Sequence, residues 1–130
     1  MKTLKEHIAK IFAQAVVCRT RKWSSRPFET QKKVFHKLIK KGKNTVFGKE
    51  HNFKNVFTHQ DFINSVPVRD YEGLRPYFER VVDGEKNITW PGKPLYFAKT
   101  SGTTSGVKYI PITKDSMPTH VKGSRDATLH

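Results

Sequence analysis

Residues 96–113 read Tyr-Phe-Ala-Lys-Thr-Ser-Gly-Thr-Thr-Ser-Gly-Val-Lys-Tyr-Ile-Pro-Ile-Thr, and this stretch says more about the fold than any other. Two short runs rich in aromatic and aliphatic residues, 96–99 and 109–112, flank a loop of small polar residues. Such runs, bounded by Gly and Ser, are typical of β-strands. The stretch therefore predicts a β-hairpin that carries the loop at its tip.

The loop, residues 100–108, contains five hydroxyl groups, two glycines and one lysine. Glycine lets backbone N–H groups approach an anion, hydroxyls donate hydrogen bonds, and lysine adds a compact positive charge, so the composition suits a polyphosphate. The same composition is also common in plain connecting loops. The loop is not a Walker A loop, because three residues separate Gly102 from Gly106 and Val107 precedes Lys108, and a G-x-G-x-x-G dinucleotide motif is absent from the sequence.

This loop resembles the ATP-phosphate signature of adenylate-forming enzymes, the superfamily of firefly luciferase and the acyl-CoA ligases. The longer stretch 96–113 more closely resembles the auxin-responsive-promoter family of acyl-acid amido synthetases, and four earlier segments resemble that family's N-terminal region in order and spacing: 47–53, 66–72, 76–79 and 90–92. Ser105 lies between Thr104 and the second glycine of the loop, as in the amido-synthetase branch. The sequence departs from the family's pattern at Lys108: the usual proline before the lysine is missing, and one residue fewer separates Gly106 from Lys108.

The resemblance implies a two-step ligase that uses ATP together with Mg²⁺. A carboxylic acid would attack the α-phosphate to give an acyl-adenylate and pyrophosphate, and the amine of an amino acid would then displace AMP to form an amide. An acyl-CoA-ligase type of enzyme remains an alternative, because in these enzymes the residues that select the acid and the acceptor lie downstream of this loop. By position in the motif, the ATP-binding groups would be Thr100, Ser101, Gly102, Thr103, Thr104, Ser105, Gly106 and Lys108.

The implied fold is α/β, and residues 1–130 would form an incomplete N-terminal part of the adenylate-forming domain. We expect residues 1–86 to be mainly helical, 87–113 to supply strands and the ATP-phosphate loop, and 114–130 to begin a truncated helix. The family's acid pocket and its adenine and ribose contacts lie downstream. We therefore expect these 130 residues alone to be inactive.

Helix signals are clear over much of the chain. Thr3 and Glu6 form a capping-box pattern, and the apolar stripe that follows predicts a helix ending near Cys18, with the thiol buried on its apolar side. A second stripe runs from Gln31 to the stop at Lys40, Lys41 and Gly42. Three further helices are expected to begin at the caps Thr58, Asp70 and Thr113, whereas residues 43–57 have little periodicity and predict a packed loop.

The charge is uneven along the chain. Residues 1–54 hold fifteen basic and three acidic groups, whereas the whole chain has a net charge of +14. This half could belong to a small nucleic-acid-binding module, but lysines on an amphipathic helix usually form a solvated face, and we expect no nucleic-acid partner. The expected partners are a small carboxylic acid and an amino acid.

Other function classes receive little support from the sequence. The six histidines show no metal-ligand spacing with a cysteine or carboxylate, so packing or solvent roles are expected and no metal site of the protein's own is predicted. A single cysteine favours a reducing compartment, and no apolar run is long enough to span a membrane. We expect a cytoplasmic protein, although a basic amphipathic N-terminus also suits an organellar transit peptide.

Overall fold

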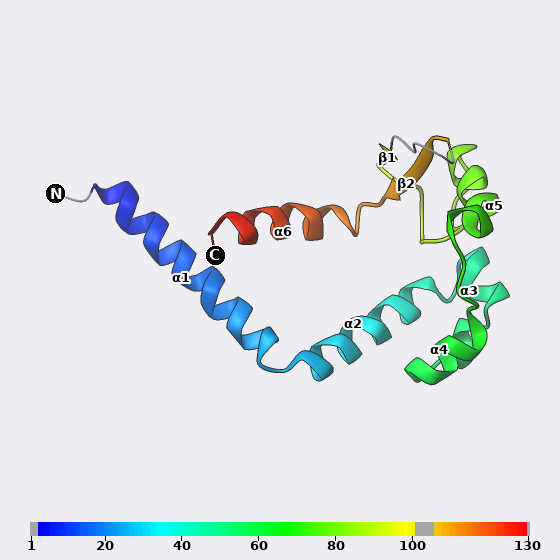
Figure 1. The fold of residues 1–130 in the computed structure, drawn as a ribbon, viewed down its shortest axis with the longest axis horizontal. Coiled ribbons are helices and arrows are strands. Elements are labelled where there is room, and N and C mark those ends of the chain that lie inside the picture. The colour runs from blue at the N-terminus through cyan, green and yellow to red at the C-terminus, as the bar shows by residue number, and fades with distance from the viewer. Residues whose placement is uncertain (1–2, 101–105, 130) are drawn as a thin grey trace.

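The computed structural model describes residues 3–100 and 106–129. In this part of the chain the elements follow one another as α1 (Leu4–Ser24), α2 (Pro27–Gly42), α3 (Val46–Glu50), the short 3₁₀ helix η1 (Phe53–Asn55), α4 (His59–Ser65), α5 (Tyr71–Val82), β1 (Tyr96–Thr100), β2 (Lys108–Ile112) and α6 (Met117–Leu129). The long helices α1 and α2 form an open V, with α5 and the hairpin beyond the far end of α2 (Figure 1). The last helix, α6, returns to pack on α1.

The predicted hairpin is confirmed. β1 and β2 pair antiparallel, with Tyr96 opposite Ile112 and Thr100 opposite Lys108. The described part of the chain is thus mostly helical with one two-stranded sheet, which agrees with an α/β N-terminal fragment. The hairpin packs on α5, so the sheet is anchored to the helical part through one of its strands, β2.

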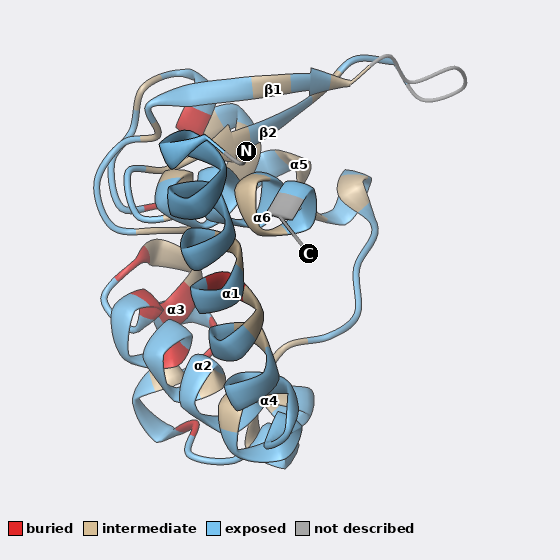
Figure 2. Cartoon of the chain, turned by 90° about the vertical axis from the view of Figure 1, so that its left-hand side faces the viewer, coloured by how far each residue is buried: buried red, intermediate tan, exposed pale blue. Residues whose placement is uncertain are grey.

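Most buried residues gather where α2 ends and α3 begins (Figure 2). Ile39 at the end of α2 and Val56 after η1 are among the few buried aliphatic side chains. The backbone N–H of Val46 donates to the carbonyl oxygen of Asn87 at 2.8 Å, and that of Phe47 donates to Ile88 at 3.0 Å. These two bonds tie the start of α3 to the segment before the hairpin.

The expected loop over residues 43–57 is wrong in part, because this segment contains α3 and η1. The buried side chain of Thr45 begins α3: its Oγ1 accepts from the N–H of Gly48 at 3.0 Å and donates to the carbonyl of Gly42 at 2.6 Å. A helix of five residues is shorter than two turns, so its apolar residues cannot show a helical period. Only the cap could have predicted it.

The expected C-terminal end of the first helix is also wrong, whereas its start after Thr3 is confirmed. α1 continues to Ser24 instead of ending near Cys18, since residues 19–24 contain no glycine or proline that would stop a helix. The thiol of Cys18 is exposed, not buried. A helix as long as α1 extends past the small core, so its apolar side is not covered along its whole length.

The starts of α2 and α6 differ by a few residues from those expected, whereas the starts of α4 and α5 agree. α2 begins at Pro27, where proline's missing N–H costs no intrahelical bond. α6 begins at Met117 after a turn in which Thr113 and Ser116 exchange hydrogen bonds of 3.1 and 2.9 Å between side chain and backbone. The caps Thr58 and Asp70 are confirmed, with the N–H groups of Asp61 and Gly73 donating to them.

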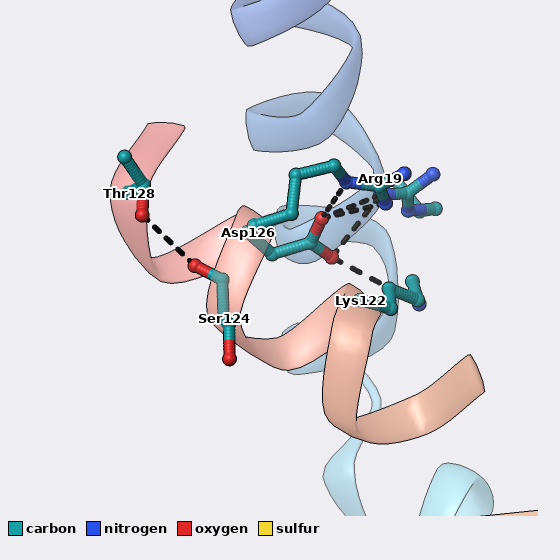
Figure 3. A network of polar contacts seen from close by, with 6 residues as sticks. Arg19, Lys122, Ser124, Asp126 and Thr128 are labelled. Carbon is teal, nitrogen blue, oxygen red and sulfur yellow. Dashed lines mark hydrogen bonds and ion pairs between the residues drawn. The ribbon is translucent and has the colours of Figure 1, made fainter. Parts of the chain in front are cut away.

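A cluster of charged side chains joins α6 to α1 (Figure 3). Arg19 of α1 donates from one Nη to both carboxylate oxygens of Asp126, each at 3.1 Å. Arg125 donates to the same carboxylate at 2.8 and 3.0 Å, and the guanidinium of Arg125 lies 5.5 Å from the centre of the Phe12 ring. The Asp126 carboxylate and the contact of Arg125 with Phe12 therefore hold the last helix to the first.

This cluster predicts a pH-dependent stability. The hydrogen bonds from Arg125 and then Arg19 lower the pKa of the Asp126 carboxyl below its ordinary value, while partial burial opposes them. As the pH falls, the Asp126 carboxyl is therefore protonated at a higher pH in the unfolded chain than in the folded one. The stabilisation by Asp126 is present above the ordinary pKa of the carboxyl and is lost as the pH falls through its lowered pKa in the folded chain. We expect Asp126→Asn to flatten the rise of the unfolding free energy with pH below about pH 4, the ordinary pKa of an aspartate.

Urea unfolding followed by circular dichroism at several pH values measures this slope. Asp115→Asn is the matched comparison, because the pKa of Asp115 is also lowered, by hydrogen bonds from Lys41 at 2.6 Å and from the indole of Trp90 at 3.1 Å. Each variant should remove its own part of the slope. If wild type and Asp126→Asn gave the same slope, Asp126 would not hold α6 in solution.

Candidate functional site

The hairpin brings the two ends of the predicted phosphate loop together. Thr100 ends β1 and lies opposite Lys108 at the start of β2. Gly106 has a φ of +76°, a backbone conformation that suits glycine, and a Cβ placed there would have no atom within 4 Å. The predicted residues Ser101, Gly102, Thr103, Thr104 and Ser105 lie outside the described residues.

Helix α5 supports the lysine end of the loop. The hydroxyl oxygen of Tyr71 accepts a hydrogen bond from the backbone N–H of Tyr109 at 2.9 Å. The ammonium of Lys108 lies 5.4 Å from the centre of the Tyr71 ring, within reach of a cation–π interaction. Tyr71 also stacks on Phe78, with 5.4 Å between ring centres. One tyrosine thus contacts both the backbone and the cation at the start of β2.

Sequence reasoning missed Tyr71. The residue follows the helix cap Asp70 directly, where it was interpreted only as the first residue of a helix, and 38 positions separate it from Tyr109. Its place within the segment 66–72 was the one signal that pointed to it, and that signal does not say which residue it contacts. The pairing needs the packing of α5 on β2, which is a non-local contact.

A cavity of about 410 Å³ lies beside this contact, between α5 and β2. Its lining combines the aromatic rings of Tyr71, Phe78 and Tyr109 with charged groups of α5. Among those groups, Arg75 pairs with Glu72 at 2.8 Å, and this hydrogen bond raises the pKa of the guanidinium. Val107 also lines the cavity, which therefore adjoins the lysine end of the loop.

A second polar cluster lies on the other side of α5. The hydroxyl of Tyr77 donates a short hydrogen bond to the carboxylate of Glu50, which raises the pKa of Tyr77. His51 is buried, stacks on Phe47 with 4.0 Å between ring centres, and has its Nδ1 2.8 Å from the Phe47 carbonyl oxygen. These are packing contacts that join α3 to α5. They satisfy His51 within the protein, as the sequence predicted for its histidines.

The described residues contain neither a metal-binding cluster nor a helix suited to a membrane. In residues 3–100 and 106–129, no three side chains of His, Cys, Asp or Glu come close enough together to hold a metal ion. None of the helices described combines the length and the apolar character needed to cross a lipid bilayer.

The sequence of this chain is similar to that of one protein family and of several known proteins. The GH3 family N-terminal domain matches residues 18–128. The jasmonoyl–L-amino acid synthetase JAR6 of Nicotiana attenuata is 28% identical over 120 residues, which cover 90% of this chain and 21% of that protein. The indole-3-acetic acid-amido synthetase GH3.3 of Arabidopsis thaliana is 28% identical over 86 residues, which cover 65% of this chain and 14% of that protein.

The chain covers a small part of each of these two relatives. The chain spans about a seventh to a fifth of the length of these two relatives, so it corresponds to one part of such a protein. The domain match, in contrast, includes α2 to α5, both strands and nearly all of α6. It also contains the loop that first suggested the resemblance. The chain therefore belongs to the GH3 family, through a match of residues 18–128 to that family's N-terminal domain.

Proposed function

We propose that this chain is the ATP-phosphate-binding part of a ligase that activates a carboxylic acid as an acyl-adenylate and transfers the acyl group to an amino acid. The observation that carries the proposal is the match of residues 18–128 to the GH3 family, in which the two relatives described above are named as amino acid or amido synthetases. On this view the substrates are ATP, a small carboxylic acid and an amino acid amine, in the cytoplasm.

The described residues at the ends of the loop fit a polyphosphate. Lys108 supplies a positive charge, and within the described residues no carboxylate forms an ion pair with it. Thr100 adds a hydroxyl donor on the facing strand, and Gly106 leaves open space for an anion to approach the backbone. The donors are of the kind that bind phosphate oxygens, and Mg²⁺ would arrive bound to ATP.

The chemistry assigned to this loop is electrostatic and positional. Bound Mg²⁺ neutralises phosphate charge, and the chain's own N–H, hydroxyl and ammonium groups orient the leaving pyrophosphate and stabilise its developing charge. No covalent intermediate on the protein is needed. Tyr71 acts indirectly, since its contacts with Lys108 and Tyr109 hold the lysine end of the loop in place.

The test uses the native polypeptide that contains this sequence, captured with an antibody raised against residues 1–130. Incubated with Mg-ATP and candidate acids, it should exchange labelled pyrophosphate into ATP only when a suitable acid is present. Addition of an amino acid should then yield an amide and AMP. The chain of 130 residues alone should show neither reaction.

The outcome also separates the two acyl acceptors. A thioester that forms only with coenzyme A, with no amide from any amino acid, would support the acyl-CoA-ligase alternative. Failure of acid-dependent exchange with every acid tested would contradict adenylation itself. Loss of exchange after Thr103→Val, with an unchanged protein level, would assign the activity to this loop.

A further inference from the structure

A hollow of about 390 Å³ lies at the apex of the V formed by α1 and α2, away from the residues assigned to ATP (Figure 1). Side chains three or four positions apart lie on one face of a helix, so one face of each helix borders the hollow. The lining includes Arg19, Lys22 and Trp23 of α1, Arg26 of the turn, and Glu29 and Lys33 of α2.

The lining carries more positive than negative charge. Of the residues just named, four are cationic and one is acidic. Arg19 already forms an ion pair with α6, and Arg26 lies 3.9 Å from Glu29 in an exposed pair that contributes little. Lys22 and Lys33 form no ion pair within the part of the chain that the structure describes. One lysine from each helix is therefore available to bind an anion.

The first turn of α2 adds hydrogen-bond donors beside these lysines. The N-cap residue, Arg26, makes no side-chain hydrogen bond to this turn, and Pro27 has no N–H group. The helix begins with the bond from the N–H of Thr30 to the carbonyl oxygen of Arg26, at 3.0 Å. The N–H groups of Phe28 and Glu29 therefore have no partner within α2. An uncapped first turn attracts anions through such N–H groups and through the helix dipole.

We infer that this hollow binds a small anion that carries at least two phosphate groups. Its phosphates would lie between Lys22 and Lys33 and accept hydrogen bonds from the uncapped N–H groups of α2. A carboxylate brings a single negative charge, whereas two phosphates bring about three or four and so balance the excess of cations around the hollow. The inference does not depend on the ligase activity, because the hollow shares no residue with the loop.

A single-stranded nucleic acid is the competing occupant, because it also carries phosphates and its bases stack on exposed aromatic rings. Trp23 is 49% exposed, and it is the one aromatic residue among the described residues that line the hollow. Surfaces that bind single strands place several rings along a groove, so that successive bases stack. A single ring beside a cluster of cations therefore favours a compact ligand.

Isothermal titration calorimetry of the 130-residue chain with sodium pyrophosphate, at low salt and without Mg²⁺, tests the inference. Lys108→Met is introduced first, because the phosphate loop is a second place at which pyrophosphate can bind. Pyrophosphate should bind this chain about tenfold more tightly than acetate, and added salt should weaken its binding. Circular dichroism before and after the titration checks that the fold is kept.

Variants assign this binding to the hollow. Lys22→Gln and Lys33→Gln each remove one exposed cation, so each should weaken pyrophosphate about tenfold without a change in circular dichroism. Lys32→Gln is the matched control. Lys32 is exposed and forms no ion pair among the described residues, but it lines a different hollow, on the other side of α2. Its replacement should leave the affinity unchanged.

Several results would overturn the inference. Equal weakening by Lys32→Gln and Lys33→Gln would mean that the net charge of the chain attracts the anion without a defined site. Binding that Lys108→Met removes entirely would place pyrophosphate in the phosphate loop alone, and no binding by either chain would contradict the site itself. Tighter binding of oligothymidylate, compared at equal concentrations of phosphate groups, would make a single-stranded nucleic acid the occupant.

Discussion

Replacing Gly48 by alanine should destabilise the fold by about 3 kcal/mol, because the added methyl group has no room. A Cβ at this position would lie 2.1 Å from the carbonyl oxygen of Gly42 and 2.8 Å from its carbonyl carbon. Both are backbone atoms, which cannot rotate away as a side chain can. The same oxygen accepts hydrogen bonds from the N–H and the hydroxyl of Thr45, at 3.0 and 2.6 Å, so any shift also weakens the start of α3.

Gly123→Ala is the matched control, since Gly123 lies within α6 and a Cβ there would meet nothing within 4 Å. Alanine has the higher helix propensity, so this variant should gain about 0.5–1 kcal/mol. Urea unfolding followed by circular dichroism gives both values. A Gly48→Ala variant within about 0.5 kcal/mol of the wild type would show that the ends of α2 and α3 are farther apart in solution.

The sequence predicted those parts of the fold that depend on neighbouring residues. The caps Thr58 and Asp70 act within three positions, and the strands of the hairpin are short runs on either side of one loop. Local propensity and turn chemistry are sufficient for such elements. The stop of α2 at Gly42 was correct for the same reason.

Contacts between distant segments were not predictable in this way. The close approach of Gly48 to Gly42 depends on the turn between two helices, and the bond from Tyr109 to Tyr71 depends on how α5 packs on the hairpin. The cluster of Asp126 and Arg19 joins residues 107 positions apart. Neither a hydrophobic period nor a helix cap predicts such pairings, because they arise only when whole elements pack together.

The candidate site, too, could be predicted from the sequence only in part. The composition of the loop suggested a phosphate ligand. The choice of ATP, and of the residues expected to bind it, came only from the resemblance to a family. The structure then added a partner, Tyr71, and a cavity that no motif contained. The exposed position of Cys18 shows the converse, since a correct apolar stripe does not say how much of it a small core can cover.

If the native protein is the proposed ligase, Lys108→Met should lower its kcat/KM for Mg-ATP about 100-fold, which is the size of effect seen when one electrostatic donor to a developing charge is lost. Methionine keeps much of the length and apolar character of the side chain, so contact with Tyr71 can persist while the charge is lost. Acid-dependent pyrophosphate exchange at varied ATP concentration measures the change. The acid's KM should move little, because the loop is assigned to phosphates alone.

Lys99→Met is the control that separates this role from general charge. Lys99 lies on the neighbouring strand, opposite Tyr109 and next to Thr100, and is exposed. Both variants remove one positive charge from the hairpin, so a long-range effect on the anionic nucleotide would lower both activities alike. A large loss in Lys108→Met alone requires a direct contact with ATP. Equal and small losses would mean that the shortened spacing after Gly106 has moved Lys108 away from the phosphates, and that the hydroxyl groups of the loop carry the binding without it.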